Sequence, residues 1–275
     1  MSENRVYQMY INGEFISKSE TIPVINPADK KIISYIPKGT KEDVDSAVNA
    51  AFEAQKSWEK LPAIQRAGYL KKIAQKIRDN ADMLAKTITE EQGKLLGLAF
   101  VEVNFTADYI DYMAEWARRY EGEIIQSDRP NENIFLFKLP IGVAAGILPW
   151  NFPFFLIARK LAPALLTGNT IVIKPSSDTP NNAFEFAKLV HETDLPKGVF
   201  NLVSGSGSEV GNSLAGNEKV GIISFTGSVP VGVKIMETAA KNVTKVSLEL
   251  GGKAPAIVMA DANIDLAVEA IKNSR

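Results

Sequence analysis

The sequence predicts an α/β protein built on a doubly wound sheet of mostly parallel strands, and three observations carry that prediction. From residue 141 onward, short β-rich runs alternate with helical patterns, which is typical of parallel strands joined by helical crossovers. Several of these runs are apolar on consecutive residues, as strands covered on both faces are. Residues 1–121 add helices with periodic apolar faces and short strands, which we expect to cover the sheet.

The composition is that of an ordinary globular protein. The 275 residues are 45% hydrophobic and 23% charged, enough to bury the core of one large or two ordinary domains. A net charge of −1 gives no long-range attraction for nucleic acid or an anionic membrane. The chain has no apolar run of bilayer-spanning length and no signal-peptide pattern, so a cytoplasmic protein is expected.

The numbers of cysteine and histidine residues exclude several kinds of metal site and catalytic mechanism. The sequence has no cysteine, which excludes disulfides, thiolate metal sites and a thiol nucleophile within these residues. A single histidine, His191, excludes a multi-histidine metal site and disfavours a Ser-His-Asp triad. We therefore expect no metal site, and we interpret His191 as a surface or packing residue.

The N-terminal segment predicts short strands and then a helix. Met9–Ile11 and Glu14–Ile16 flank Asn12-Gly13, a dipeptide that favours the type I′ turn of a hairpin. Further strands are expected at residues 24–25 and 32–36. A helix should then begin at Thr40, where Asp43 three residues later gives a pattern close to a capping box.

Helical patterns and one hairpin occupy the next region. Helices are expected across roughly 62–91 and 99–119, with apolar faces that we interpret as cover packed on the core. Between Gly122 and Phe137, two apolar arms bracket the polar turn at 128–131. A hairpin of this kind is a candidate pairing edge for another subunit.

The alternating region supplies the predicted sheet. Strands are expected at 141–148, 170–174, 199–203, 220–225 and 243–250, with helices after Pro153, Asn181 and Ser208 and another ending near Ala240. The apolar run Ala256–Met259 then precedes a helix over Ile264–Arg275. That helix carries no stop signal, so we expect the natural protein to continue beyond it.

Two glycine motifs lie at the carboxyl ends of predicted strands, where doubly wound sheets bind ligands. Gly205–Gly211 is a loose dinucleotide fingerprint whose last spacing is one residue too long; a tight strand-helix turn is the alternative. In Phe225–Gly232, Gly227 permits a sharp turn, Ser228 can cap the helix, and Gly232 allows close packing. The helix N-terminus there offers N–H groups and a positive dipole end to a pyrophosphate.

Two further strand ends carry polar candidates. Asn151 lies in the stiff segment Pro149–Pro153, where a fixed amide can stabilise an oxyanion. The other interpretation is a helix N-cap before proline, and the two are compatible. Lys174 ends a strand and either binds ribose hydroxyls or terminates the strand in solvent.

Glu249 is the remaining candidate. It lies in an apolar strand next to the pair Gly251-Gly252, which permits close approach of a ligand. Partial burial would raise the pKa of this carboxyl group and suit it to act as a general base. The alternative is a structural pair with Lys245 or Lys253.

Taken in order, five motifs resemble the aldehyde dehydrogenase superfamily. They are Leu148-Pro-Trp-Asn-Phe-Pro153, Gly168-Asn-Thr-Ile-Val-Ile-Lys-Pro175, Leu195-Pro-Lys-Gly-Val-Phe-Asn201, Phe225-Thr-Gly-Ser228 and Leu248-Glu-Leu-Gly-Gly-Lys253. Residues 105–122 look most similar to the lactaldehyde/glycolaldehyde dehydrogenases. The resemblance implies a Rossmann-like NAD(P)-binding domain at 1–121 and 142–249. It also implies a protruding oligomerisation hairpin at 122–141 and the start of a catalytic domain at 250–275.

The same resemblance implies roles for single residues. In this family a cysteine thiolate attacks the aldehyde, and an asparagine amide, matching Asn151, holds the oxyanion. Hydride then passes to the nicotinamide, and a glutamate, matching Glu249, activates the water that hydrolyses the thioester. The positions that match cofactor contacts are Leu148, Trp150, Lys174, Ser177, Gly205, Gly227, Ser228 and Leu250.

Two departures from the family pattern matter. Many relatives carry, at the position of Ser177, a glutamate that binds the adenosine ribose and repels a 2′-phosphate. We therefore expect NAD as cofactor, with NADP possible. The family's nucleophilic cysteine follows the helix that matches Ile264–Arg275, and this sequence contains no cysteine.

The expected function is NAD(P)-dependent oxidation of a small aldehyde, such as lactaldehyde, to its carboxylate. These residues represent the cofactor-binding part of that enzyme, and the activity of this chain alone is left open. The expected partners are the aldehyde and further copies of the chain, joined through 122–141. The alternative is a catalytically inactive nucleotide-binding or assembly partner that needs a separate C-terminal chain.

Overall fold

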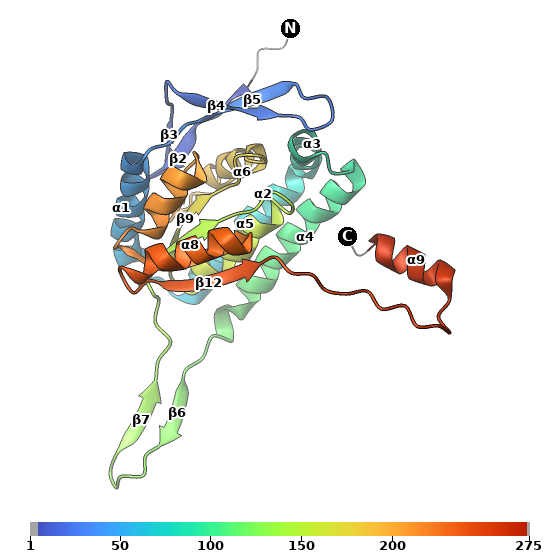
Figure 1. The fold of residues 1–275 in the computed structure, drawn as a ribbon. Coiled ribbons are helices and arrows are strands. Elements are labelled where there is room, and N and C mark those ends of the chain that lie inside the picture. Colours follow the sequence, from blue (N-terminus) through green and yellow to red (C-terminus); the bar gives the residue numbers. More distant parts are fainter. Residues whose placement is uncertain (1–4, 274–275) are drawn as a thin grey trace.

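The computed structural model describes residues 5–273, and its centre is a seven-stranded sheet in the order β12-β11-β8-β9-β10-β2-β3 (Figure 1). Five neighbouring strands are parallel: β8 (Val143–Ile147), β9 (Thr170–Lys174), β10 (Phe200–Leu202), β11 (Val220–Gly227) and β12 (Lys245–Leu250). The N-terminal strands β2 (Met9–Ile11) and β3 (Glu14–Ile16) extend the sheet in antiparallel pairing. The predicted doubly wound, mostly parallel sheet is therefore confirmed.

Helices cover both faces of this sheet. One face packs on α5 (Phe155–Leu166) and α6 (Asn181–His191), which are backed by α2 (Ala63–Asp79), α3 (Ala81–Gln92) and α4 (Leu96–Ala114). The opposite face packs on α1 (Lys41–Trp58), α7 (Asn212–Ala215) and α8 (Val229–Ala240). Because side chains alternate along a strand, Ile171 and Ile173 enter the first core and Val172 enters the second.

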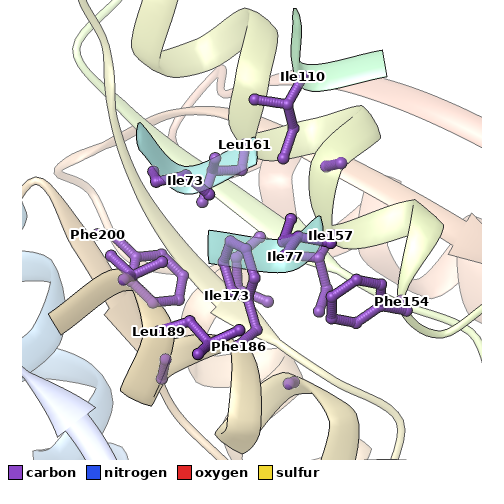
Figure 2. Packing of buried hydrophobic residues seen from close by; sticks show 14 of the residues in the cluster. Ile73, Ile77, Ile110, Phe154, Ile157, Leu161, Ile173, Phe186, Leu189 and Phe200 are labelled. Carbon is purple, nitrogen blue, oxygen red and sulfur yellow. The ribbon is translucent and has the colours of Figure 1, made fainter. Parts of the chain in front are cut away.

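The larger core lies between the sheet and α2, α4, α5 and α6. Figure 2 shows its side chains meeting from these separate segments, with Ile173 of β9 beside residues of α2 and α6. The residues labelled there are Ile73, Ile77, Ile110, Phe154, Ile157, Leu161, Ile173, Phe186, Leu189 and Phe200. This packing fixes the orientation of α5 and α6, the two helices that follow β8 and β9.

The N-terminal predictions are confirmed in outline. Asn12 and Gly13 both have positive φ, 52° and 77°, as the hairpin turn between β2 and β3 requires. β5 (Ile32–Pro37) pairs with β1 (Arg5–Val6) on one side and with β4 (Thr21–Ile25) on the other, in a separate three-stranded sheet. Helix α1 begins after Thr40, whose backbone N–H donates to the Asp43 carboxylate at 2.9 Å.

Several predicted boundaries were wrong. The helical stretch at 62–91 is two helices that meet at Asn80, and the next helix begins at Leu96 and ends in a 3-10 turn, η1 (Glu115–Arg118). The strand expected from residue 243 begins at Lys245, because Val243 has a left-handed φ of 55°. The run Ala256–Met259 forms no strand; residues 251–259 are exposed coil with no neighbouring strand to pair with.

Two segments extend away from the sheet (Figure 1). The hairpin of β6 (Glu123–Gln126) and β7 (Asn133–Leu136) protrudes, and every residue of both strands is exposed. After β12, a long coil carries α9 (Ile264–Asn273) away from the sheet, and the last two residues of the predicted helix lie outside the described residues. None of the helices within residues 5–273 has the length and apolar character needed to cross a membrane.

Candidate functional site

The predicted site residues come together at the carboxyl edge of the five parallel strands. Lys174, Gly227 and Leu250 end β9, β11 and β12. Leu148 directly follows β8, and Gly205 lies a few residues after β10. Since these strands are adjacent in the order β12-β11-β8-β9-β10, residues from five separate segments lie along one edge.

Hydrogen bonds join the loops at this edge. The Leu148 backbone N–H donates to the Lys174 carbonyl at 3.0 Å. The Ser177 hydroxyl donates to the Gly205 carbonyl at 3.1 Å, so the loops after β9 and β10 are in direct contact. The hydroxyl of Thr179 lies 3.4 Å from the backbone carbonyl of Trp150, a residue that is 58% exposed. The three loops therefore form one continuous surface.

Lys174 is buried, with 5% of its surface exposed, so the alternative that it ends a strand in solvent was wrong. Burial lowers the pKa of its ammonium group to about 8, and the charge of Asp178 opposes that shift. Its Nζ donates to the Pro175 carbonyl at 3.1 Å. Since an ammonium group has three donors and no other protein acceptor lies within reach among residues 5–273, Lys174 can donate to a ligand.

The glycine loop after β10 is a tight turn. Gly205 has φ 143°, and a Cβ there would lie 2.5 Å from Val210 Cγ2. The Ser206 hydroxyl accepts the Glu209 N–H at 3.1 Å, and a single π-helical turn, η2 (Gly207–Gly211), leads into α7. The geometry therefore matches the strand-helix turn that was the alternative to a dinucleotide fingerprint.

The second glycine motif leaves a helix N-terminus open. Ser228 is the N-cap of α8, yet its exposed hydroxyl makes no capping hydrogen bond. Gly232 packs against β12, where a Cβ would lie 2.7 Å from Leu250 Cδ2. The unpaired N–H groups of the first turn and the free hydroxyl are donors suited to a phosphate.

Asn151 is exposed, and its alternative role as a helix N-cap was wrong. Helix α5 begins at Phe155 with Phe154 as N-cap, and the Glu102 carboxylate accepts the N–H groups of both, at 3.1 and 2.9 Å. The Asn151 backbone carbonyl accepts hydrogen bonds from the side chains of Gln92, at the end of α3, and Lys94, in the connection to α4. Its side-chain amide makes none within the described part of the chain, so it is available to a ligand.

Glu249 is exposed, so the predicted partial burial was wrong. It lies on β12, an edge strand whose single neighbour in the sheet is β11. Within residues 5–273 it forms no ion pair, which leaves the pairing with Lys245 or Lys253 unsupported. Glu249 stands opposite Thr226 of β11 in the parallel register.

Lys160 of α5 was missed by sequence reasoning. Its Nζ lies 3.0 Å from the hydroxyls of Ser224 and Thr226, directly beside the strand that carries Glu249. Burial lowers the pKa of Lys160 to about 8, the charge of Arg159 adds to that effect, and Glu249 opposes it. The available signal was a lysine placed between apolar residues on the buried face of a helix.

A doubly wound sheet with tight glycine turns and an open helix N-terminus at its carboxyl edge is the architecture of nucleotide-binding α/β proteins. Within that class, the chain belongs to the aldehyde dehydrogenase family, whose family model matches residues 15–275.

Known relatives agree with this assignment. Lactaldehyde dehydrogenase of Escherichia coli is 65% identical over 98% of this chain, and its crystal structure superimposes with a TM-score of 0.97 over 99% of the chain. A structure of 3,6-anhydro-L-galactose dehydrogenase in complex with NAP is 45% identical over 98% of the chain, with a TM-score of 0.95. Betaine aldehyde dehydrogenase from Staphylococcus aureus in complex with NAD+ is 38% identical over 97% of the chain, with a TM-score of 0.94.

The chain spans little more than half of these relatives. It covers 57% of the lactaldehyde and 3,6-anhydro-L-galactose enzymes and 54% of the betaine aldehyde enzyme.

Proposed function

We propose that these residues are the cofactor-binding part of an NAD(P)-dependent aldehyde dehydrogenase that oxidises a small aldehyde such as lactaldehyde. One observation carries the proposal: a buried lysine with free donors and an open helix N-terminus lie on the same strand edge as Asn151 and Glu249. Residues 1–121 and 142–249 would form the cofactor domain, and residues 250–275 would begin the catalytic domain. The assignment to the cytoplasm stays a prediction.

The residues at the edge suit a dinucleotide. Lys174 would donate to ribose hydroxyls, and Ser228 with the first turn of α8 would hold the pyrophosphate. Gly205 and Gly227 would contact the cofactor through their backbone, and a Cβ at either position would collide with Val210 or Phe225. The cofactor, when bound, supplies the hydride acceptor. The remaining expected contacts are Leu148, Trp150, Ser177 and Leu250.

Two side chains would act on the aldehyde. The Asn151 amide, exposed and free of protein partners among residues 5–273, would donate to the carbonyl oxygen as it gains negative charge. The Glu249 carboxylate, exposed on β12, would take a proton from the water that completes the oxidation.

The nucleophile is the part that these residues do not supply. The 275 residues contain no cysteine, and we propose that the attacking thiol comes from protein outside them. The test is NADH production from lactaldehyde and NAD+ by the chain alone and after addition of the second half of a related enzyme. We expect no turnover alone and restored turnover with the added half. Turnover by the chain alone would overturn the proposal, and tight NADH binding without restored turnover would favour an assembly partner.

The cofactor preference depends on Ser177. Its hydroxyl is engaged with the Gly205 carbonyl, and it places no carboxylate where a 2′-phosphate would be repelled. We therefore propose that NADP+ is accepted beside NAD+. Fluorescence titration with NADH and NADPH measures the two dissociation constants, and a preference for the NAD form of a hundredfold or more would contradict this.

A further inference from the structure

The loop that carries Asn151 is held by side chains from a distant segment. Gln92, at the end of α3, donates from Nε2 to the backbone carbonyl of Asn151 at 2.7 Å. Lys94, just before α4, donates from Nζ to the same oxygen at 3.1 Å. Two donors from residues nearly sixty positions away therefore fix the backbone of the residue proposed to bind the oxyanion.

Lys94 also links this loop to a buried carboxylate. Its Nζ forms a short ion pair with Glu102, whose side chain is only 1% exposed. The second oxygen of Glu102 accepts the N–H groups of Phe154 and Phe155. The same carboxylate therefore caps the N-terminus of α5, the helix that follows the loop. Lys94 Nζ lies 4.0 Å from the ring centroid of Phe152, at cation–π distance.

These contacts hold the part of the loop that carries Asn151. Residues 150–154 precede the first turn of α5. The carbonyls of Phe152 and Phe154 accept hydrogen bonds from that turn, at 3.1 and 3.2 Å, whereas the backbone carbonyl of Asn151 is bonded by the side chains of Gln92 and Lys94. The restraints on Asn151 itself are the two donors on its backbone carbonyl. Its neighbours are held by Thr179 at the Trp150 carbonyl, by the Lys94 contact with the Phe152 ring, and by the Glu102 carboxylate and core packing at Phe154. The backbone of Asn151 is therefore fixed, while its side-chain amide makes no hydrogen bond to the described residues. A fixed backbone orients the amide, and the amide can still bind a substrate.

We propose that Gln92, Lys94 and Glu102 form a clamp that positions the Asn151 amide, so the connection between α3 and α4 sets the geometry of the oxyanion-binding group. The role of Asn151 in this inference rests on the proposed function. That the clamp holds the loop at 150–154 in one conformation does not depend on that function. These three are positioning residues, because they act through the Asn151 loop and not on the substrate.

The first test is hydrogen exchange of backbone amides in the 275-residue chain. Two variants loosen the clamp differently: Gln92→Leu removes one donor, and Lys94→Met combined with Glu102→Gln removes the ion pair without leaving a buried charge unpaired. We expect exchange at residues 151–155 to rise about tenfold or more, while the amides of β9 stay protected. Lys86→Met, at an exposed lysine of α3 outside these contacts, is the matched control and should change neither. Unchanged exchange at 151–155 in both clamp variants would overturn the proposal.

The second test uses the complete enzyme of the proposed function. Lys94→Met with Glu102→Gln should lower kcat about 10- to 100-fold with little change in the KM for NAD+, since a displaced group of this kind costs on that order. Lys94→Arg, which keeps the charge and the donors, should recover most of the rate. Combining the clamp variant with Asn151→Ala should add little further loss.

The outcomes separate the two claims. A fully additive loss in the combined variant would overturn the clamp, because it would then act independently of Asn151. If Asn151→Ala leaves kcat unchanged, the proposed function of Asn151 fails, and the exchange experiment alone still decides whether the clamp orders the loop.

Discussion

Among single residues, Lys174 is a buried lysine whose charged form is destabilised by loss of water. The residue is 5% exposed, and burial brings the pKa of its ammonium group down to about 8. In the unfolded chain the same group keeps a pKa near its ordinary value of about 10.4. The difference is a free-energy cost that the folded protein carries whenever Lys174 is protonated.

This cost predicts a pH dependence of stability. Between about pH 8 and 10 the unfolded chain binds more protons at this position than the folded chain, so the free energy of unfolding should rise with pH. Lys174→Met should remove about 1–3 kcal/mol of that rise. The measurement is the urea midpoint of both proteins from pH 7.5 to 10. A rise of equal size in the variant would contradict the assignment. Because the pKa of Lys160 is lowered as well, part of the rise should persist in the variant.

The Asn151 amide gives a second prediction. In the complete enzyme, Asn151→Ala should lower kcat about 100- to 1000-fold, because one oxyanion donor is lost. NADH binding to the 275-residue chain should be unchanged, since the backbone of the loop is retained. Stopped-flow measurement of the hydride step checks the first expectation and fluorescence titration the second. Asn151→Asp, which replaces the donor with a negative charge, should be no more active than the alanine variant.

The side chains at this edge of the sheet could be predicted from the sequence, but their burial could not. Lys174 is the last residue of β9 and Glu249 the last but one of β12, yet the first is buried and the second exposed. The difference follows from strand order, since β9 lies between two neighbours and β12 lies at the sheet edge. The pattern of one strand does not reveal its neighbours, so burial could not be predicted.

At the scale of elements, the loop after β10 depends on one backbone conformation. Gly205 has φ 143°, and a Cβ there would meet Val210 at 2.5 Å and the Gly39 carbonyl at 3.1 Å. Gly207 in the same loop has open space around it. The two glycines differ in how much the fold needs them.

This contrast predicts unequal effects of alanine. Gly205→Ala should destabilise the chain by about 1–3 kcal/mol, because the residue must be strained or the loop must shift. Gly207→Ala should change the free energy of unfolding by less than about 0.5 kcal/mol. Urea unfolding of both variants measures this, and equal effects would show that the loop tolerates a Cβ at both sites.

The elements themselves were predicted more successfully than their ends. The span of β9 was predicted residue for residue, because an apolar run bounded by turn residues defines a buried strand. The helix expected after Pro153 does begin there, at Phe155, but its first N–H groups donate to Glu102 of another helix instead of Asn151. A cap supplied from a remote segment leaves no local signal.

At the scale of the whole molecule, the protruding hairpin is the surface most suited to another copy of the chain. Ile124 and Phe135 face each other across β6 and β7, and they are 79% and 58% exposed. An exposed strand pair with apolar side chains favours pairing with another strand, so we propose that residues 122–141 mediate oligomerisation.

The hairpin proposal has a direct test. Ile124→Lys combined with Phe135→Lys should shift the protein to smaller assemblies in sedimentation experiments, because the apolar contact is lost. Asp128→Lys, in the exposed turn of the same hairpin, changes charge without touching the apolar arms and should leave the assembly unchanged. An unchanged sedimentation coefficient in the double variant would place the interface elsewhere.

The hairpin β2–β3 cannot complete its native contacts until residues near 201 have been synthesised. Its Asn12 N–H donates to the Asn201 side chain at 2.8 Å, across 189 positions of sequence. At ordinary translation rates the ribosome needs about 10–40 s to cover that distance, so the first strands emerge long before their partner exists. For that interval their apolar residues have no native place to dock. The nascent chain should therefore recruit chaperones early and release them once β10 has left the ribosome.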